Sequence, residues 1–216
     1  MVDRNMRVEI WSDVACPWCY VGLARFERAV EETGVDVDVV FRAFELDARV
    51  AIGRSSPLLT DYLARKYGDP SRVRAAHARL TDAGSEVGID FRWEGMRRAN
   101  TFDAHRLLSW ALDDGGPTKQ RTLKKALLRS YFTDGLDVAD HAVLTEVALE
   151  VGLDPDEATS MLASDRYAEH VRAEQEDAHR NGIAAVPTFV VNDGWMLQGA
   201  HDTSAWIRAL TKISDD

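Results

Sequence analysis

Hydrophobic and polar positions alternate near both ends of the chain and follow helical spacing in between. Residues 7–12 alternate well enough to predict a strand. Apolar side chains then recur at helical spacing over residues 17–30, and Gly34 supplies a stop for that helix. Residues 37–46 carry apolar side chains on alternate positions and predict a second strand. The chain is therefore expected to open with a β-α-β unit.

The middle of the chain has a different character. Residues 47–57 lose the periodicity and carry glycine, serine and proline, which predicts a linker. The region after it is expected to be helical except for an irregular break at 88–95 and a Gly-Gly-Pro interruption at 115–117. The predicted helices span residues 58–67, 70–87, 101–112, 119–132, 140–151, 156–162 and 165–181.

The last part of the chain returns to a strand pattern. Residues 184–191 are rich in β-formers, an Asn-Asp-Gly turn follows at 192–194, and 195–198 is the partner strand of a hairpin. A final helix is predicted over 203–213. Pro187 lies within the first of these strands, which is unusual because proline donates nothing to a strand ladder.

Composition restricts the function classes. The 216 residues are 45% hydrophobic and 29% charged, typical of a globular protein with one large domain or two small ones. A formal net charge of -10 argues against nucleic-acid binding, which depends on lysine and arginine. No window approaches the roughly 18 apolar residues that a membrane span requires. Charged residues at positions 3, 4, 7 and 9 do not fit a signal peptide, so we expect a cytoplasmic protein.

The two cysteines of the chain, Cys16 and Cys19, lie at the junction between the first predicted strand and helix. If Pro17 opens the helix, Cys16 lies at its N-terminus, where free backbone N–H groups favour an anion. Such a cysteine has a depressed pKa and forms the thiolate that attacks disulfides. Cys19, one turn further along the same face, is placed to close a disulfide. Catalytic dithiol chemistry is therefore the leading interpretation.

Three other interpretations of the cysteine pair are weaker. A zinc site would need two of the six histidines, and none of them forms a close histidine pair, so no metal is expected. Two inert buried cysteines at this spacing and place would be a coincidence. A purely structural disulfide would close only a short loop and remove little entropy from the unfolded chain.

Together these motifs resemble the DsbA family of thioredoxin-fold proteins, and its cytosolic FrnE-like branch in particular. The likeness covers essentially the whole chain. The cysteine motif and the Val-Pro pair are specific in combination, and the helical motifs between them are softer signals. The residues that carry it are Asp13-Val14-Ala15-Cys16-Pro17-Trp18-Cys19-Tyr20-Val21-Gly22, Asn100-Thr101, Ala104-His105-Arg106, Val186-Pro187-Thr188-Phe189 and Gly199-Ala200.

The resemblance implies an α/β thioredoxin-like fold, β-α-β then β-β-α, interrupted by a large all-helical insertion. Residues 1–54 and 182–216 would form the discontinuous thioredoxin-like domain, and 55–181 the insertion, as a lid over the site. It also implies a cis Val186–Pro187 bond lying against the cysteines, where these two residues shape the groove for a substrate.

The implied function is a cytoplasmic thiol-disulfide oxidoreductase with Cys16 and Cys19 as catalytic residues and no cofactor. Protein or peptide thiols and disulfides are the expected partners, with glutathione or another thiol as a co-substrate. Trp18 is expected to be exposed beside the substrate, whereas Trp11 is either part of the core or of an apolar rim. Asn100 and His105 are candidate substrate contacts, although a lone histidine on a helix is more often structural.

The alternative is a glutathione-dependent isomerase or transferase of the hydroxychromene-carboxylate isomerase or kappa type. Those relatives usually carry serine at the first motif position, whereas this chain has Cys16. The periplasmic oxidants of the family tend to have histidine between the cysteines, where this chain has Trp18. We therefore expect a milder oxidant, with a reduction potential anywhere from roughly −270 to −120 mV.

Overall fold

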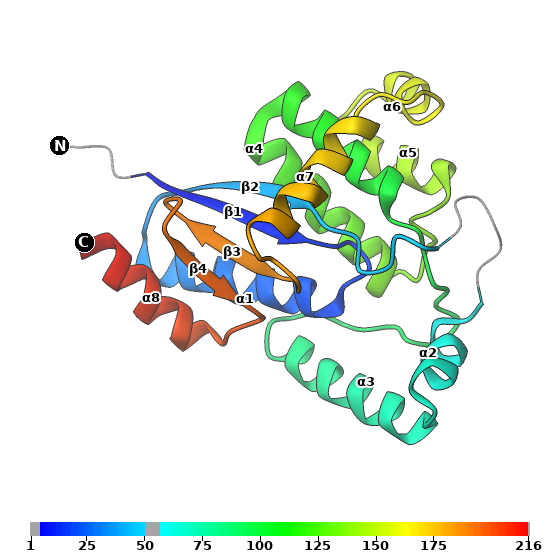
Figure 1. Cartoon of the computed structure of the whole chain (residues 1–216), viewed down its shortest axis with the longest axis horizontal. Coiled ribbons are helices and arrows are strands. Elements are labelled where there is room, and N and C mark those ends of the chain that lie inside the picture. The colour runs from blue at the N-terminus through cyan, green and yellow to red at the C-terminus, as the bar shows by residue number, and fades with distance from the viewer. Residues whose placement is uncertain (1–4, 51–56, 216) are drawn as a thin grey trace.

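Four strands form one mixed sheet in the order β2-β1-β3-β4 (Figure 1). The computed structural model describes residues 5–50 and 57–215. β1 pairs in parallel with β2, whereas β1 with β3 and β3 with β4 pair antiparallel. The strands are β1 (Met6–Ser12), β2 (Val37–Ala43), β3 (Thr188–Val191) and β4 (Trp195–Gln198).

Helices cover both faces of this sheet (Figure 1). α1 and α8 pack together on one face, while α4 and α7 contact β2 on the other. α5 and α6 pack against α4, whereas α2 and α3 pack on each other as a separate pair, of which α3 contacts α1. The helices are α1 (Pro17–Thr33), α2 (Leu59–Tyr67), α3 (Pro70–Ser85), α4 (Phe102–Phe132), α5 (His141–Glu150), α6 (Pro155–Leu162), α7 (Ala168–Arg180) and α8 (Thr203–Asp215).

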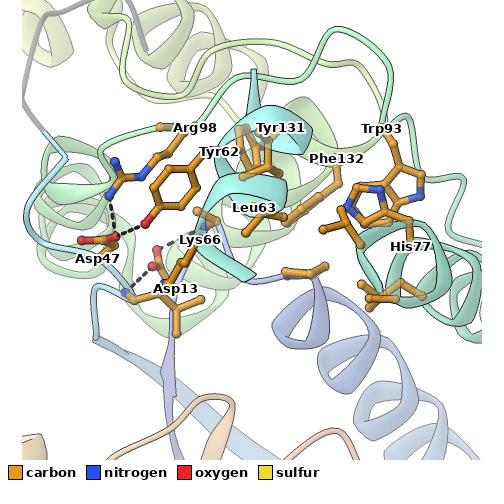
Figure 2. Close-up of a pocket in the computed structure, with 18 of the residues that line it drawn as sticks. Asp13, Asp47, Tyr62, Leu63, Lys66, His77, Trp93, Arg98, Tyr131 and Phe132 are labelled. Carbon is orange, nitrogen blue, oxygen red and sulfur yellow. Dashed lines mark hydrogen bonds and ion pairs between the residues drawn. The ribbon is translucent and has the colours of Figure 1, made fainter. Parts of the chain in front are cut away.

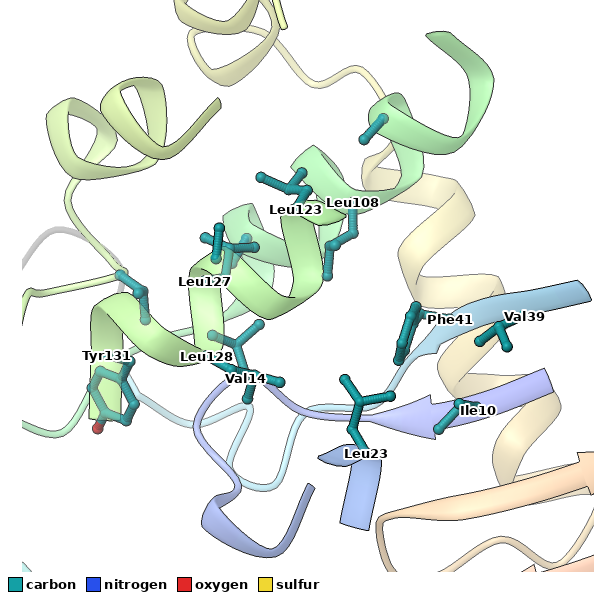
Figure 3. Close-up of a cluster of buried hydrophobic side chains, with 14 of the residues drawn as sticks. Ile10, Val14, Leu23, Val39, Phe41, Leu108, Leu123, Leu127, Leu128 and Tyr131 are labelled. Atoms are coloured by element: carbon teal, nitrogen blue, oxygen red, sulfur yellow. The ribbon is translucent and has the colours of Figure 1, made fainter. Parts of the chain in front are cut away.

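The buried core continues through the sheet and both helical layers. Between the sheet, α1 and α8, the rings of Phe26, Phe189 and Trp206 meet with centroids 4.6 to 5.4 Å apart. On the other face, the leucines of α4 pack toward β1, β2 and the turn after β1 (Figure 3). Burial of each large apolar side chain stabilises the fold by roughly 1.5–3 kcal/mol. One core therefore fixes α4 against the turn that carries the cysteines.

The predicted element order is confirmed: β-α-β, a helical region, then β-β-α. This is the thioredoxin-like topology with a large helical insertion between β2 and β3. Helix signals also hold locally, since Gly34 and Gly68 end α1 and α2 in left-handed conformation. The Gly-Gly-Pro interruption appears as non-helical backbone at Gly116 within α4. The predicted insertion begins at residue 55, which lies outside the described residues.

Three of the predicted boundaries are wrong by three or four residues. β2 ends at residue 43 rather than 46, because the Leu46 amide donates to the Asp13 carboxylate instead of a strand partner. β3 begins at Thr188 rather than residue 184, since Pro187 has no N–H to donate to the ladder. α7 begins at Ala168 rather than residue 165, after Tyr167 adopts positive φ.

Candidate active site

The cysteine pair lies where β1 ends and α1 begins. Cys16 is the N-cap residue of α1, with extended backbone, and Pro17 takes the first helical position as predicted. The Cys19 amide donates to the Cys16 carbonyl oxygen at 3.0 Å. Both cysteines are free thiols, and Cys16 is 4% exposed against 1% for Cys19. Cys16 is thus the sulfur nearer to the surface.

The loop before β3 lies directly against this motif. The Val186–Pro187 peptide bond is cis, as the resemblance implies. The Cys16 thiol donates to the Val186 carbonyl oxygen, with the sulfur 3.7 Å away. Gly22 of α1 makes this approach possible, because a Cβ there would lie 3.0 Å from Cγ of Pro187. The sequence motif and the Val-Pro pair, 170 residues apart, are therefore in contact.

A buried carboxylate lies beside the motif. Asp13, 1% exposed, accepts hydrogen bonds from the amides of Leu46 at 2.7 Å and Ala15 at 3.2 Å. Nε2 of His105 on α4 lies 3.5 Å from its Oδ1. Burial by itself would raise the pKa of Asp13, but His105 and the Leu46 amide outweigh it and lower the pKa. Asp13 is accordingly held as a carboxylate inside the protein.

A buried ammonium completes the interior side of the site. Lys124 of α4 has no exposed surface, and its Nζ donates to the Ser12 carbonyl oxygen at 3.2 Å. Burial lowers the pKa of Lys124, while Cys19, Asp13 and Cys16 pull it upward. The pKa of Lys124 is lowered on balance, and its amino group contacts the end of β1.

The two thiols differ in their tendency to ionise. A hydrogen bond between them, followed by burial, raises the pKa of Cys16 well above its ordinary value. Burial would raise the pKa of Cys19 too, but the Cys16 thiol, Lys124 and the Ser12 side chain lower it. The depressed pKa expected for Cys16 stays a prediction, because the hydrogen bond that raises the pKa of Cys16 is the same bond that lowers the pKa of Cys19. The two thiols are therefore coupled, so that one of them favours ionisation of the other.

A cavity of about 500 Å³ opens beside the motif, and Asp13 is one of the residues that line it (Figure 2). Ala15 and Pro17, the neighbours of Cys16 in sequence, form part of its wall. Most of the remaining wall is apolar or aromatic and comes from α2, α3 and the end of α4. The side chains include Leu59, Tyr62, Leu63, Val73, Leu80, Trp93, Tyr131 and Phe132.

Charged groups gather at one edge of this cavity, where Figure 2 shows Asp47 linked to both Arg98 and Tyr62. Burial acts against ionisation of Asp47, but bonds from Arg49, Tyr62 and Arg98 lower its pKa to about 2. Across the cavity, the His77 ring stacks on Trp93 with centroids 4.1 Å apart. The cavity thus has a fixed ionic edge and an aromatic wall.

The predicted site residues differ in how far they are exposed and in what they contact. Trp18 is 40% exposed, next to the cysteines, whereas Trp11 is buried against Phe44 and Val186. His105 is buried and faces Asp13 from inside. The Asn100 amide group is used within the protein, donating to Val50 O at 2.8 Å and accepting from Phe102 N at 3.0 Å.

Sequence reasoning missed Lys124. In the sequence it stands beside Lys125 and looks like part of a solvated helix surface. The missed signal is its spacing, since Lys124, Leu127, Leu128 and Tyr131 follow the i, i+3, i+4, i+7 pattern of a buried helix face. A lysine at a buried position of an apolar helix face indicates a polar contact inside the protein.

Two exclusions hold for the part of the chain that the structure describes. Within residues 5–50 and 57–215, no three His, Cys, Asp or Glu side chains are grouped so that they could hold a metal ion. None of the helices in those ranges is both long and apolar enough to cross a membrane.

Fold and site together define a thioredoxin-like α/β protein with a Cys-x-x-Cys pair facing a cis-proline. A model of the DSBA-like thioredoxin domain matches residues 7–210. The chain belongs to this DsbA-like family of thiol-disulfide oxidoreductases.

Solved structures agree with this assignment. A probable DsbA oxidoreductase from Streptomyces coelicolor is 36% identical, with a TM-score of 0.89 over 98% of this chain and 91% of that one. Two more distant structures share the fold. A 2-hydroxychromene-2-carboxylate isomerase is 16% identical, with a TM-score of 0.73 and 96% of each chain covered. The cytosolic disulfide reductase DsbM from Pseudomonas aeruginosa, with GSH, is 17% identical, with a TM-score of 0.67 over 97% of this chain and 100% of that one.

Proposed function

We propose that this protein is an enzyme that exchanges disulfides with thiol substrates through Cys16 and Cys19. One observation carries the proposal: two free thiols lie at the N-terminus of α1, with Cys16 against the carbonyl of Val186 beside a cis-proline. That arrangement offers one sulfur in the residue nearer the surface, a second sulfur within the same helical turn and a backbone edge for an extended substrate.

The exchange proceeds in two displacements. In the oxidising direction, a substrate thiolate attacks Sγ of Cys16 in the disulfide form, and the S–S bond breaks with its electron pair leaving on Cys19. A second substrate thiolate then attacks the substrate sulfur of the mixed disulfide, and Cys16 leaves. Reduction of a substrate disulfide is the same sequence in reverse. Cys16 is the attacked sulfur because it is the more exposed of the two.

Substrate recognition is assigned to both sides of Cys16. On one side, Val186 and Pro187 offer a peptide or glutathione its backbone contact, and exposed Trp18 offers an apolar surface. On the other, the cavity beside Ala15 and Pro17 accepts an apolar group of the substrate. Trp11, Asn100 and His105 would act through the residues that they position, because all three are buried.

A cytoplasmic location and the FrnE-like branch remain part of the proposal. They draw support from the fold shared with a cytosolic disulfide reductase. The presence of GSH with that reductase makes glutathione a reasonable co-substrate here, alongside protein and peptide thiols.

A second candidate is a glutathione-dependent isomerase or transferase. The cavity next to Cys16 and the fold shared with a hydroxychromene-carboxylate isomerase favour it. The two candidates differ in their need for Cys19. Isomerisation or transfer with glutathione does not need Cys19, whereas release of a mixed disulfide within the protein needs both Cys16 and Cys19.

The test is an insulin-reduction assay with mass spectrometry of the intermediates. The oxidoreductase proposal expects activity in the wild type, and adducts of substrate on Cys16 that accumulate in the Cys19→Ser variant. If Cys19→Ser keeps full activity with glutathione and no adduct accumulates, the dithiol function is refuted and the second candidate takes its place.

A further inference from the structure

Ring side chains from α2, α3, α4 and the loop before α4 line the cavity beside the cysteine motif. They are Tyr62, Tyr67, His77, Trp93, Tyr131 and Phe132. At about 500 Å³, the cavity is within the range of roughly 300–1,000 Å³ that encloses a small organic molecule. Neither Cys16 nor Cys19 is among the described residues that line it, so the cavity holds a ligand without contact to sulfur.

The aromatic part of this wall is fixed by contacts within the protein. The ring of Trp93 stacks on His77 and on Phe91, with centroids 4.1 and 4.8 Å apart and interplanar angles of 5° and 8°. The Trp93 indole N–H donates to the Thr81 hydroxyl at 2.9 Å, and Phe132 meets Phe91 edge-on. Burial lowers the pKa of His77, so its ring adds no charge to the wall at neutral pH. A planar ligand therefore meets a preformed surface, and contacts between rings add to the effect of apolar burial.

The two carboxylates among the described lining residues already have partners. Asp13 accepts two backbone amides, and its Oδ1 lies 3.5 Å from Nε2 of His105. Asp47 is paired with Arg98 and accepts the Tyr62 hydroxyl at 3.0 Å. A cationic ligand would have to displace these contacts, so the wall does not favour one.

One cation of the wall, Lys66 of α2, has no carboxylate partner. Arg98 holds an aspartate, and Arg72 has a carboxylate oxygen 3.7 Å from its Nε. Across residues 5–50 and 57–215, no Asp or Glu oxygen lies within 4.0 Å of the Lys66 Nζ, which lies 5.7 Å from the ring centroids of both Tyr62 and Tyr67. Lys66 is exposed, so its ammonium lies where the cavity meets solvent (Figure 2). The unpaired charge of the wall is thus positive and is placed beside rings.

We propose that this cavity is a binding site for a small aromatic molecule with one anionic group, its rings among the aromatic side chains and its anion beside Lys66. The inference deepens the recognition assigned to the cavity above, and the role of this molecule as a substrate rests on the proposed function. Binding itself requires neither sulfur. In a substrate of this class, the disulfide or thiol end would lie toward Ala15 and Pro17, the lining residues that flank Cys16 in the sequence.

The first experiment is isothermal titration calorimetry on the Cys16→Ser, Cys19→Ser double variant, which has no exchange chemistry. The probes are 2-naphthoate, its neutral counterpart 2-naphthalenemethanol and the aliphatic anion octanoate. The naphthoate should bind more tightly than octanoate, and about two- to fivefold more tightly than the neutral probe, the range expected for an exposed ion pair. Lys66→Met should remove the second difference without weakening the neutral probe. Arg65→Met is the matched control, because Arg65 is exposed on the same helix and does not line the cavity; it should leave all affinities unchanged.

A variant inside the cavity locates the binding. Leu63→Glu places a charge in the apolar wall and should weaken both naphthalene probes at least tenfold. Unchanged affinities in this variant would place the probes elsewhere and overturn the site, as would a Kd above about 1 mM for all three probes. Equal affinity for the naphthoate and the neutral probe, or for the naphthoate and octanoate, overturns the ligand class.

A second experiment connects the site to exchange in the wild type. The naphthoate should raise KM for 4,4′-dithiodipyridine and leave kcat unchanged, because both molecules occupy the cavity. An unchanged KM would remove the link between the site and the substrate. Binding to a protein without exchange activity would uphold the site and refute the proposed function, whereas exchange with insulin and no binding would overturn the site alone.

Discussion

The two sides of the cysteine pair are built from opposite materials. Inside, the turn after β1 and helix α4 bring together the side chains of Asp13, His105 and Lys124, all with at most 2% exposure, and Asp13 also borders the cavity. Outside, α2, α3 and the end of α4 surround an open cavity whose wall is mainly apolar (Figure 2). Charges where water is excluded act strongly on a thiol, and apolar surface where water enters is available to a ligand. We therefore propose that the interior side controls reactivity and that the cavity side serves substrate recognition.

The two sides also differ in how firmly their helices are held by buried contacts. α4 is held by the continuous core through Leu123, Leu127 and Leu128, all without exposed surface (Figure 3). By contrast, α2 has no buried residue, and its main contacts are with α3. Elements with few buried contacts open at low free-energy cost. The chemical side is therefore rigid, and the cavity side is the one that adapts.

The largest effect on the exchange rate should come from replacing Cys16, which lies between the two sides. Cys16→Ser should reduce the exchange rate with insulin roughly 10³-fold or more, because no other group replaces the sulfur that is removed. Circular dichroism should show an unchanged fold, since a serine fits the same N-cap position. Stopped-flow kinetics compare it with the wild type. A Cys16→Ser protein that retains a tenth of the activity would place the chemistry elsewhere.

The next effect tests the interior side. Asp13→Asn should lower the free energy of unfolding by about 1–3 kcal/mol at pH 7, because the amides of Leu46 and Ala15 lose a charged acceptor. Urea unfolding at a series of pH values measures it.

The contribution of Asp13 to stability should depend on pH in a defined direction. Since the folded protein lowers the pKa of Asp13, its contribution is complete above the unfolded pKa of about 3.9 and is lost as pH falls through the folded value. The difference between wild type and Asp13→Asn should be constant from pH 5 to 7 and shrink below about pH 4. A difference that grows in acid would contradict the buried carboxylate.

A smaller effect is expected on the cavity side. Leu63→Glu places a charge in the apolar wall and should raise KM for a neutral aromatic disulfide, 4,4′-dithiodipyridine, about tenfold, the equivalent of ~1.4 kcal/mol of lost contact. Arg65→Gln on the exposed face of α2 changes net charge by the same amount and is the control. Equal KM values for both variants would remove the cavity from substrate recognition.

The smallest effect concerns the exposed tryptophan between the cysteines. Trp18→Ala should change unfolding free energy by less than about 0.5 kcal/mol, as surface substitutions do. It should raise KM for a peptide disulfide a few-fold with kcat unchanged, because only a surface contact is lost. Steady-state kinetics with a fluorescent peptide decide this, and a drop in kcat alone would assign Trp18 to the chemistry instead.

The sequence predicts those features of the structure that are decided by a few neighbouring residues. The helix ends at Gly34 and Gly68 and the cap at Asp69 could be read directly, because each is decided by a few neighbouring residues. The cysteine motif, too, is a local pattern.

The rest of the site depends on distant contacts. The end of β2 depends on an Asp13 oxygen 33 positions away, which no periodicity reveals. The ionisation of the cysteines depends also on Lys124, over 100 residues away, which helix-end reasoning does not include. The cavity arises where α2 and α3 face the motif, and that placement is tertiary.

The most direct test of the account is a redox titration of the wild-type protein across glutathione ratios, with free thiols counted by mass after alkylation. The account predicts a reversible two-electron transition in which Cys16 and Cys19 lose their thiols together, at a potential between roughly −270 and −120 mV. If the two cysteines form no disulfide with each other at any ratio, dithiol exchange is not what this site does.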